Sequence, residues 1–509
     1  MSIRSYHRKS EKNINMHRPV KVERKDIYFK PDKKRVLARF FSLGDDRTIK
    51  VIKRLLALTE MERKEVFGQV LRSYTKRHRS IVNIFERNYN RVSHLLEKIP
   101  FQKEQLNQLD KLLIGSYFTM EYSIESAALF NPSIVEHPDQ TELFKGEKRV
   151  ILSFRATGEG HVSSIVFRSG TLDVDNNIHI DYIGNLLDKP IQVKNHRYHK
   201  ESFLKKMNEL HAEPTEVKTK LEEKLTATFT YEELKRYIDE VRQTSEDNLE
   251  NITFLQQALW LASSHYEMTF SLDTSISERV IFPIADTEKR GIEDARFVQF
   301  KDEKGENIYY ATYTAYDGFS ILPKLLATKD FYHFKVKPIY GEIANKGAAL
   351  FPRKINGRYA MLCRIDGENN YIAYSHNINI WQETAIRIQQ PEYPYEFVQI
   401  GNCGSPIETQ YGWLILTHAV GPMREYVLGA ALLDLDNPHV EIGRLHSPLM
   451  TPNDKEREGY VPNVIYSCGA LIHNEHLILP YAMSDYASTY ATIKLEDLLL
   501  AILNPDRYQ

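Results

Sequence analysis

The sequence predicts a mainly β fold, a five-bladed β-propeller with an N-terminal helical region and a helical insertion. Five segments share one design: an apolar strand, a polar break, a second apolar strand and a turn. The first starts at Arg149, and the others start at Ile308, Arg358, Gly412 and His476, at intervals of 50, 54 and 64 residues. Repeats of this length are typical of propeller blades, whose polar breaks can converge on one end of a central channel. The alternative is a β-sandwich decorated with helices.

Two blocks of helical periodicity lie outside the repeats. Apolar residues recur at three- and four-residue spacing over residues 50–99, and again at about 200–266. In the second block, Thr230 and Glu233 have the spacing of a capping box. This block fills the wide gap after the first repeat, so we expect it to be an insertion within one β domain.

The start of the chain is strongly basic. Residues 1–35 hold twelve Lys and Arg against four Asp and Glu. We therefore expect residues 1–45 to form a solvated, partly disordered arm, or to contact a partner or a neighbouring subunit. Residues 46–115 are then the N-terminal helical region, and residues 116–505 are the propeller.

Bulk composition disfavours several classes of protein. The net charge of −1 gives no global field for nucleic acid or an anionic membrane. Cys363, Cys403 and Cys468 are an odd count without metal-ligand spacing, which indicates free thiols in a reducing, cytoplasmic compartment. The sequence shows no secretory signal and no run of 18 apolar residues. It also lacks the common nucleotide, serine-hydrolase and zinc-protease motifs, so we expect neither a cofactor nor a metal.

The densest cluster of reactive side chains is GIEDARF, residues 291–297. Neighbouring residues of a strand point to opposite faces, so one of the carboxylates Glu293 and Asp294 can face the channel while the other binds structure. Arg296 follows two residues later. The alternative is an ordinary turn with a salt bridge.

Two further clusters hold carboxylates in loops before strands. Glu408 and His418 lie in residues 401–421, and Glu456 lies in residues 453–472. Taken alone, each of these residues is more often a solvated loop carboxylate or a packed histidine. Convergent carboxylates without a metal motif nevertheless fit glycoside cleavage, which needs an acid and a base or nucleophile.

Basic residues form a third kind of candidate. Lys346 in ANKGAALFP and Arg364 in LCRIDG could each bind an anion or a sugar hydroxyl. Arg364 and Asp366 could equally form an ordinary ion pair.

Several of these stretches resemble glycoside hydrolase family 130, which contains β-mannoside phosphorylases and β-1,2-mannosidases. The resemblance runs through most of residues 115–500 and is carried by FNPS (130–133), GIEDARF (291–297), NKGAALFPRKINGRYAMLCRIDG (345–367), GNCGSPIETQYGWLILTHAVG (401–421) and EREGYVPNVIYSCGALI (456–472). It implies a five-bladed propeller with Asp294 as the general acid, whose proton passes through a mannose hydroxyl. The family's usual proline after this residue is Ala295 here.

The resemblance also bears on the attacking group. Phosphorylases of the family line the attacking side with basic residues, and the match puts Lys346 and Arg364 at two such positions. A third position, commonly Lys in phosphorylases, is Glu408 here. A carboxylate about 4 Å from phosphate would cost about 4 kcal/mol at an effective dielectric near 20. We therefore expect inverting hydrolysis of terminal β-mannosides, most often β-1,2-linked, with Glu408, helped or replaced by Glu456, activating water.

The remaining site residues are expected to bind the manno-oligosaccharide or the acceptor, which is water or inorganic phosphate. They are Glu293, Arg296, Tyr313, Asp317, Lys346, Arg364, Asp366, His418, Tyr426 and Asp485. Three alternatives stay open: a phosphorylase releasing α-mannose 1-phosphate, a non-catalytic sugar-binding propeller, and a scaffold that assembles into a homo-oligomer through its helical N-terminus.

Overall fold

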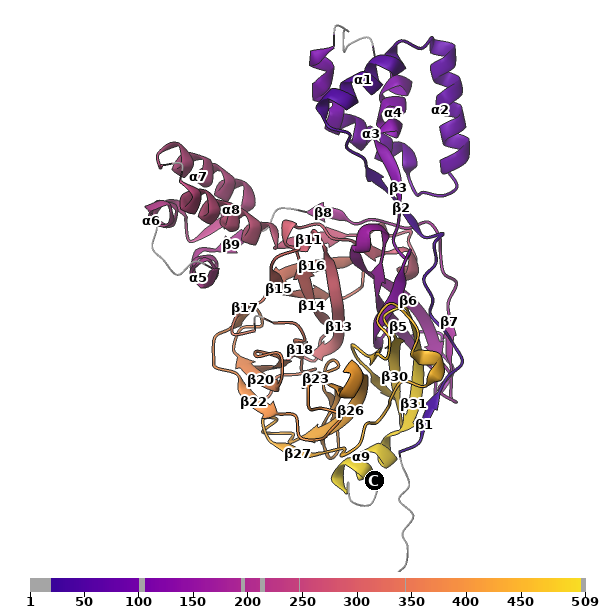
Figure 1. Cartoon of the computed structure of the whole chain (residues 1–509), viewed down its shortest axis with the longest axis vertical. Helices are drawn as coiled ribbons and strands as arrows, with labels where there is room; N and C mark the ends of the chain where they lie inside the picture. The colour runs from indigo at the N-terminus through magenta and orange to yellow at the C-terminus, as the bar shows by residue number, and fades with distance from the viewer. Residues whose placement is uncertain are drawn as a thin grey trace, which may run out of the picture.

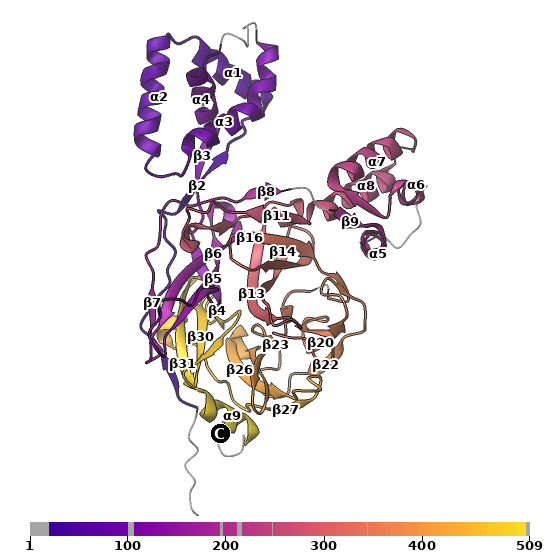
Figure 2. The same ribbon diagram turned by 180° about the vertical axis from the view of Figure 1, so that it is seen from behind.

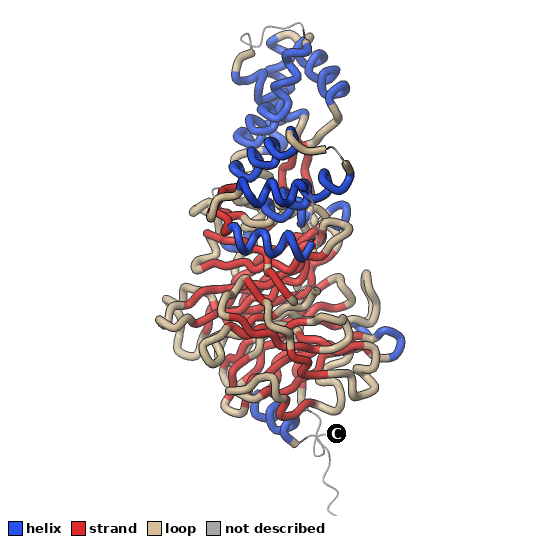
Figure 3. Tube along the Cα trace, turned by 90° about the vertical axis from the view of Figure 1, so that its left-hand side faces the viewer, coloured by secondary structure: helices blue, strands red, loops and turns tan. Residues whose placement is uncertain are grey.

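A computed structural model describes residues 20–99, 106–193, 197–210, 216–246, 248–343 and 345–504. Figure 1 shows a ring of β-sheets with one helical unit above it and a second helical unit beside it, and Figure 2 shows the same arrangement from behind. Seen from the side, in Figure 3, the strands are gathered in the ring and most of the helices lie beyond it. The expectation of a mainly β chain with two helical blocks agrees with this arrangement.

Most of the described strands form five successive groups, of which the first two are joined where Gly291 pairs in parallel with Ser163. The first is β4 (Ala128–Glu136), β5 (Lys148–Thr157), β6 (Ser163–Leu172), β7 (Ile178–Ile180) and β12 (Val280–Ile281). The second is β13 (Gly291–Lys301), β14 (Asn307–Tyr316), β15 (Ile321–Thr328) and β16 (His333–Pro338), extended by β11 (Tyr266–Thr269) and β8 (Ile191–Val193). The third is β18 (Ala349–Leu350), β19 (Tyr359–Cys363), β20 (Asn370–Ser375) and β22 (Ile386–Gln389).

The last two groups complete the ring. The fourth is β23 (Gln399–Asn402), β24 (Ile407–Thr409), β25 (Gly412–Val420), β26 (Tyr426–Leu433) and β27 (Glu441–Arg444). The fifth is β28 (Ile465–Tyr466), β29 (Leu471–His473), β30 (His476–Met483), β31 (Ala487–Lys494) and β1 (Val22–Arg24). A short parallel pair, β17 (Tyr340–Gly341) and β21 (Ile380–Trp381), joins the outer parts of the second and third groups.

Apolar packing holds neighbouring groups together all the way round. Separate buried clusters lie between the first and second groups, the second and third, the third and fourth, the fourth and fifth, and the fifth and first. Element contacts follow the same order, with β4 lying against both β13 and β30. The ring therefore closes by side-chain packing between sheets, which is dominated by the burial of apolar surface.

The strand registers give the ring two distinct ends. At one end lie the turns that join the long paired strands of each group, such as the turn after Tyr316, which pairs with Gly291. These turns are residues 158–162, 317–320, 364–369, 421–425 and 484–486. We call this end the site end. The turns 302–306 and 410–411 lie at the opposite end, because the strands that lead into them run the length of the sheet.

The N-terminal helical unit contains α1 (Asp45–Leu56), α2 (Glu60–Tyr74), α3 (Ile81–Val92), η1 (Ser93–Lys98) and α4 (Gln108–Tyr117), which share one apolar core. The pair β2 (Val36–Phe40) and β3 (Thr119–Ser123) joins it to the ring. Thr59 and Asn107 begin α2 and α4 with capping boxes, which satisfy backbone N–H groups that a helix start leaves unpaired.

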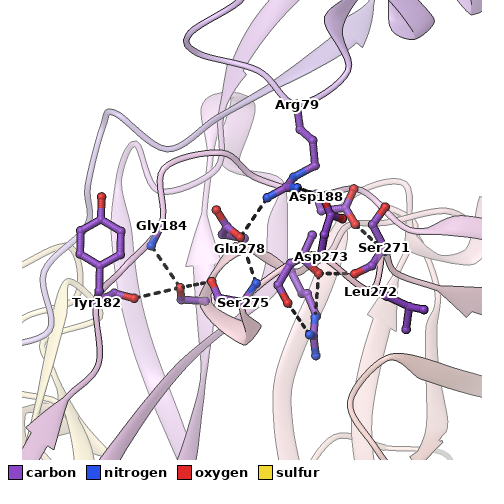
Figure 4. A network of polar contacts seen from close by, with 12 residues as sticks. Arg79, Tyr182, Gly184, Asp188, Ser271, Leu272, Asp273, Ser275 and Glu278 are labelled. Carbon is purple, nitrogen blue, oxygen red and sulfur yellow. Dashed lines mark hydrogen bonds and ion pairs between the residues drawn. The ribbon is translucent and has the colours of Figure 1, made fainter.

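A polar contact fastens this helical unit to the ring (Figure 4). Arg79 donates to Asp273 at 2.7 Å and to Glu278 at 3.1 Å. Glu278 also accepts the backbone N–H of Ser275. Arg79 therefore binds a carboxylate whose position is held by a second hydrogen bond.

The insertion contains β9 (Arg197–His199), α5 (Lys200–Leu210), α6 (Glu216–Lys224), β10 (Thr228–Thr230), α7 (Tyr231–Gln243) and α8 (Leu249–Ser263) around its own core. Thr230 and Glu233 form the expected capping box at the start of α7. A short helix, α9 (Leu495–Leu503), follows the last strand.

Within the first 45 residues, the described part, from residue 20 on, differs from the expected solvated arm. Residues 22–24 add a strand to the outer edge of β31, and the backbone of Phe29 pairs with that of Ser488. Residues 1–19 lie outside the described residues. Part of the basic segment is therefore integral to the fifth group.

The described part of the chain lacks two kinds of feature. None of its helices is both long and apolar enough to cross a membrane. Within those residues there is also no group of three or more His, Cys, Asp or Glu side chains that could hold a metal ion. The three cysteines are free and buried.

A buried charge cluster stabilises the junction below the helical unit. Glu125 accepts Arg35 at 2.7 Å and Arg168 at 2.8 Å, and the three side chains are at most 3% exposed. Arg35 also donates to the carbonyl oxygens of Gly184 and Ser277. One carboxylate therefore compensates the positive charge of two buried guanidinium groups.

We predict that Glu125→Gln lowers the free energy of unfolding by about 3–5 kcal/mol, because it leaves two buried cations uncompensated. The shift in the denaturant midpoint checks this value. Glu60→Gln, at an exposed ion pair with Lys64, is the control and should leave the midpoint unchanged. Equal midpoints for the two variants would contradict the prediction.

Candidate functional site

Three polar residues with left-handed backbones meet at the site end of the ring. Asn131, Asp294 and Asp485 have φ angles of 49°, 53° and 52°. Asp294 lies where the pairing of β13 with β14 shifts register, which is a bulge that changes the direction of a side chain. Asn and Asp adopt this conformation more readily than other residues with a side chain. The bulge therefore takes Asp294 out of the regular pairing of β13 with β14.

Arg155 lies between the two adjacent carboxylates of β13. It donates to Glu293 at 2.9 Å and to Asp294 at 3.4 Å. Asn131 donates its amide N–H to Asp294 at 2.7 Å, and Lys346 donates to the other oxygen of Glu293 at 2.6 Å. Two cations and an amide therefore hold both carboxylates in place.

This environment sets the charge of Asp294. Burial alone would raise its pKa, but the guanidinium of Arg155 and the hydrogen bond from Asn131 outweigh burial and lower the pKa below its ordinary value. Among these groups of the protein, Asp294 is therefore ionised at neutral pH.

The pKa of Asp485 is shifted in the opposite direction. This residue lies in the turn between β30 and β31, where burial and the negative charge of Asp294 raise its pKa to about 6, against the effect of Arg155 and Arg424. Two neighbouring carboxyl groups with pKa values moved apart are the arrangement expected of an acid–base site.

A cationic surface lies beside these carboxylates. Arg364 donates to the carbonyl of Gly367 and to Gln399 at 3.3 Å. Arg296 is 3% exposed and donates to the hydroxyl of Tyr466 at 2.7 Å. The Nε atoms of Arg296 and Arg364 are buried and have no hydrogen-bond partner within the described ranges. With Lys346 these side chains can hold an anion.

His418 lines the same surface in its neutral form. Burial, with the charges of Arg364 and Arg296, lowers its pKa well below the ordinary value. Nδ1 lies 3.1 Å from the carbonyl oxygen of Asn402, so Nδ1 carries the proton of the neutral ring. The ring of Tyr426 stacks on it, with centroids 6.3 Å apart.

Glu408 does not lie near Asp294, contrary to expectation. It pairs in register with Trp413 on β25, whereas Gly401 of the site end pairs with His418. Five residues of strand separate the two positions, or about 16 Å at 3.3 Å per residue. Its carboxylate is 46% exposed and accepts Arg353 at 2.7 Å, so it cannot activate water at Asp294.

Glu456 also fails as a water-activating base. It is 3% exposed, and one oxygen accepts Arg24 at 3.0 Å and the hydroxyl of Tyr481 at 2.7 Å. The other oxygen accepts the backbone N–H of Asn453 at 2.9 Å. Glu456 instead clamps β1 onto the fifth group.

Three expected sugar-binding residues serve the fold instead. The hydroxyl of Tyr313 donates to buried Glu288 at 2.8 Å, inside the second group. Asp317 accepts Trp260 of α8 at 3.1 Å and two backbone N–H groups of its own turn.

Asp366 is the third of these residues. It accepts the backbone N–H groups of Glu368 and Asn369, each at 2.9 Å. Its other oxygen accepts the amide of Asn369 and the hydroxyl of Tyr371. Both oxygens are therefore occupied within the turn, and no ion pair with Arg364 forms.

The structure thus separates the expected residues into two sets. Brought together at the site end are Glu293, Asp294, Arg296, Lys346, Arg364, His418, Tyr426 and Asp485. Sequence reasoning assigned no role to Asn131 or Arg155. Sequence features nevertheless marked both residues as candidates. Asn131 lies in the family stretch FNPS, and Arg155 lies in the polar break of the first repeat.

Known proteins match this chain over much of its β portion. The family model described as beta-1,4-mannooligosaccharide phosphorylase matches residues 271–503. A 1,2-beta-oligomannan phosphorylase of Thermoanaerobacter sp. (strain X514) is 33% identical over 217 residues, which are 42% of this chain and 71% of that protein. A beta-1,2-mannobiose phosphorylase of Listeria innocua is 29% identical over 263 residues, 50% of this chain and 72% of that protein.

Among solved structures, the beta-1,2-mannobiose phosphorylase from Listeria innocua in complex with beta-1,2-mannobiose has a TM-score of 0.43 and 21% identity. It covers 75% of this chain, and the match covers 93% of that chain.

We predict that Asp485→Asn stabilises the protein above pH 6 by roughly 3 kcal/mol, since two pKa units correspond to about that energy. The raised pKa means that the native protein holds this proton more tightly than the unfolded chain. The parent therefore loses stability relative to the variant as pH rises from about 4 to about 6. Melting temperatures of both proteins at pH 4 and pH 8 check this difference.

The matched control is Asp366→Asn. The hydrogen bonds to Asp366 lower its pKa, so its contribution is present above pH 4 and this variant should be less stable than the parent at pH 8. A stability difference for Asp485→Asn that does not change with pH would refute the assignment.

Proposed function

This chain belongs to glycoside hydrolase family 130, and we propose that it is an enzyme that cleaves terminal β-mannosidic bonds with inorganic phosphate as the attacking group. The observation that carries the proposal is the cationic surface of Arg296, Lys346 and Arg364 beside Asp294. Glu408 lies at the opposite end of its sheet, about 16 Å along the strand from Gly401. The β-1,2 linkage is proposed because two similar proteins are named for β-1,2-linked substrates.

We propose further that the five strand groups are the blades of a propeller, which residues 116–505 form together with the strand β1. Five apolar clusters, one between each pair of neighbouring groups, support this architecture. The site is then one end of the central channel, where groups from several blades converge. Assembly through the helical region of residues 46–115 stays a prediction.

Asp294 is proposed as the general acid. In the free protein, surrounding cations keep it ionised, and an acid must carry a proton. A phosphate bound to those cations adds negative charge nearby, which raises the pKa of a neighbouring carboxyl. The acid would therefore be protonated when the attacking group is in place, and Asp485 would hold a proton close by at pH 6.

The reaction then balances without a cofactor. A phosphate oxygen forms a bond to the anomeric carbon while the bond to the glycosidic oxygen breaks. Asp294 supplies the proton that the leaving oxygen takes up, through a mannose hydroxyl. Inversion gives α-mannose 1-phosphate and a sugar chain shorter by one unit, and Asp294 regains a proton from phosphate or water.

Hydrolysis, which we expected from the sequence, would lack both of its expected bases, Glu408 and Glu456, in this arrangement. Glu408 is exposed at the other end of the ring, and both oxygens of Glu456 are occupied. Glu293 is held by Arg155 and Lys346. None of these three carboxylates is therefore both placed and free to take the proton of a water molecule at the cationic surface.

We predict that β-1,2-mannobiose is cleaved only when phosphate is present, with α-mannose 1-phosphate as the product. Ion chromatography of reactions with and without phosphate measures this. Asp294→Asn should lower turnover by about 10²–10⁴-fold, the usual contribution of a general acid. Free mannose released at the same rate without phosphate would overturn the phosphorylase assignment and restore the hydrolase.

We predict that Arg364→Gln raises the KM for phosphate at least tenfold and changes the KM for mannobiose much less, since a charged hydrogen bond contributes about 1.5–3 kcal/mol. Initial rates with each substrate varied in turn separate the two constants. Arg353→Gln, which removes the partner of Glu408 at the opposite end, is the control and should change neither constant. Equal increases in both constants would argue against a phosphate role for Arg364.

A further inference from the structure

A groove lies between the helical insertion and the ring. Its volume is about 590 Å³, within the range of about 300–1,000 Å³ typical of small-molecule sites, which often lie between domains. One wall comes from α5 and α8 of the insertion, and the other from the start of β15 and the segments that hold β17 and β21. Figure 1 shows α5 beside β17 at this border.

Trp260 gives the groove a fixed aromatic side chain. Its indole N–H donates to Asp317 at 3.1 Å, and Asp317 also accepts the backbone N–H groups of Phe319 and Ser320. The ring therefore cannot turn away from the β14–β15 turn, while part of it remains exposed. A rigid, half-exposed indole is a suitable surface for the apolar face of a sugar ring.

Polar side chains of both kinds surround this ring. Lys205 and Gln382 offer donors, and Glu342 and Gln382 offer acceptors, and all three side chains are exposed. Among the residues that the structure describes, none of the three makes a hydrogen bond or ion pair with the protein through its side chain. Mixed donors and acceptors around an aromatic ring match a neutral polyhydroxylated ligand better than an anion.

The groove is close to the reacting groups. Its wall residue Glu342 is four residues before Lys346, and four extended residues span at most about 14 Å. Its other wall starts at Ser320, in the turn that follows Tyr316, and Tyr316 pairs with Gly291, three residues before Asp294. Both walls thus lead to the site end of the ring.

We propose that this groove binds the distal sugar units of a manno-oligosaccharide whose terminal mannose lies at Asp294. The proposal rests on the proposed function and extends it to the substrate class. It gives the insertion a role in the selectivity for longer chains. When the terminal mannose is held among Asp294, Arg155 and Asp485, the remaining units must leave past the rim. Ser320 and Glu342, near this rim, line the groove.

The test compares β-1,2-mannotetraose with β-1,2-mannobiose in the full-length protein. The double variant Glu342→Ala/Gln382→Ala should lower kcat/KM for the tetraose at least fivefold, since one lost hydrogen bond corresponds to roughly that factor. It should leave mannobiose unchanged. Trp260→Phe, which keeps an aromatic ring but loses the N–H, should act in the same direction. Gln256→Ala, an exposed position on α8 outside the groove lining, is the matched control.

Equal effects on both sugars, or no effect on the tetraose, would overturn the proposal while leaving the phosphorylase assignment intact. If the parent cleaves no mannoside, the proposed function fails, and calorimetric titration with both sugars then tests the groove directly. Tighter binding of the tetraose than of mannobiose, lost in the double variant, would support the groove. Equal affinities in the parent would refute it.

Discussion

The interaction on which the site depends is the pair of contacts that Arg155 makes with Glu293 and Asp294. Two adjacent carboxylates in a buried place would repel each other and lose their hydration, which costs several kcal/mol per ion unless cations compensate. Arg155 from the first group and Lys346, which precedes the third, supply that compensation. The same contacts join strands from three parts of the chain, so the charge balance and the closure of the ring support each other.

The charge balance also links chemistry to ligand binding. The cations that keep Asp294 ionised in the free protein are those that can attract an anionic acceptor, and a bound anion would reverse their effect on the carboxyl. At Asp485, burial and the charge of Asp294 outweigh Arg155 and Arg424, so the pKa is raised. Two aspartates a short distance apart can therefore differ in protonation near neutral pH, with no metal needed to separate them.

The two helical units are attached in different ways. The N-terminal unit is joined through β2, β3 and the contacts of Arg79, near the buried cluster of Arg35, Glu125 and Arg168. The insertion is joined beside the site end, where Trp260 and Asp317 hold α8 to a turn of the second group. The groove beside the insertion is lined by Ser320 and Glu342, which lie near the site end of the ring.

The sequence by itself determined the strand repeats, the helical blocks, the capping box at Thr230 and the resemblance carried by GIEDARF, because periodicity and short motifs are local properties. Only the tertiary structure decided which residues of a motif meet. Glu408 is seven residues from Gly401 in sequence, but they pair with opposite ends of β25, so the two residues lie at opposite ends of the sheet. Tyr313, Asp366 and Glu456 carry suitable groups whose partners lie elsewhere in the fold, and Arg155 becomes central only because the first and second groups pack together. Distances and burial across the ring fix these roles, and neither can be read from the order of residues.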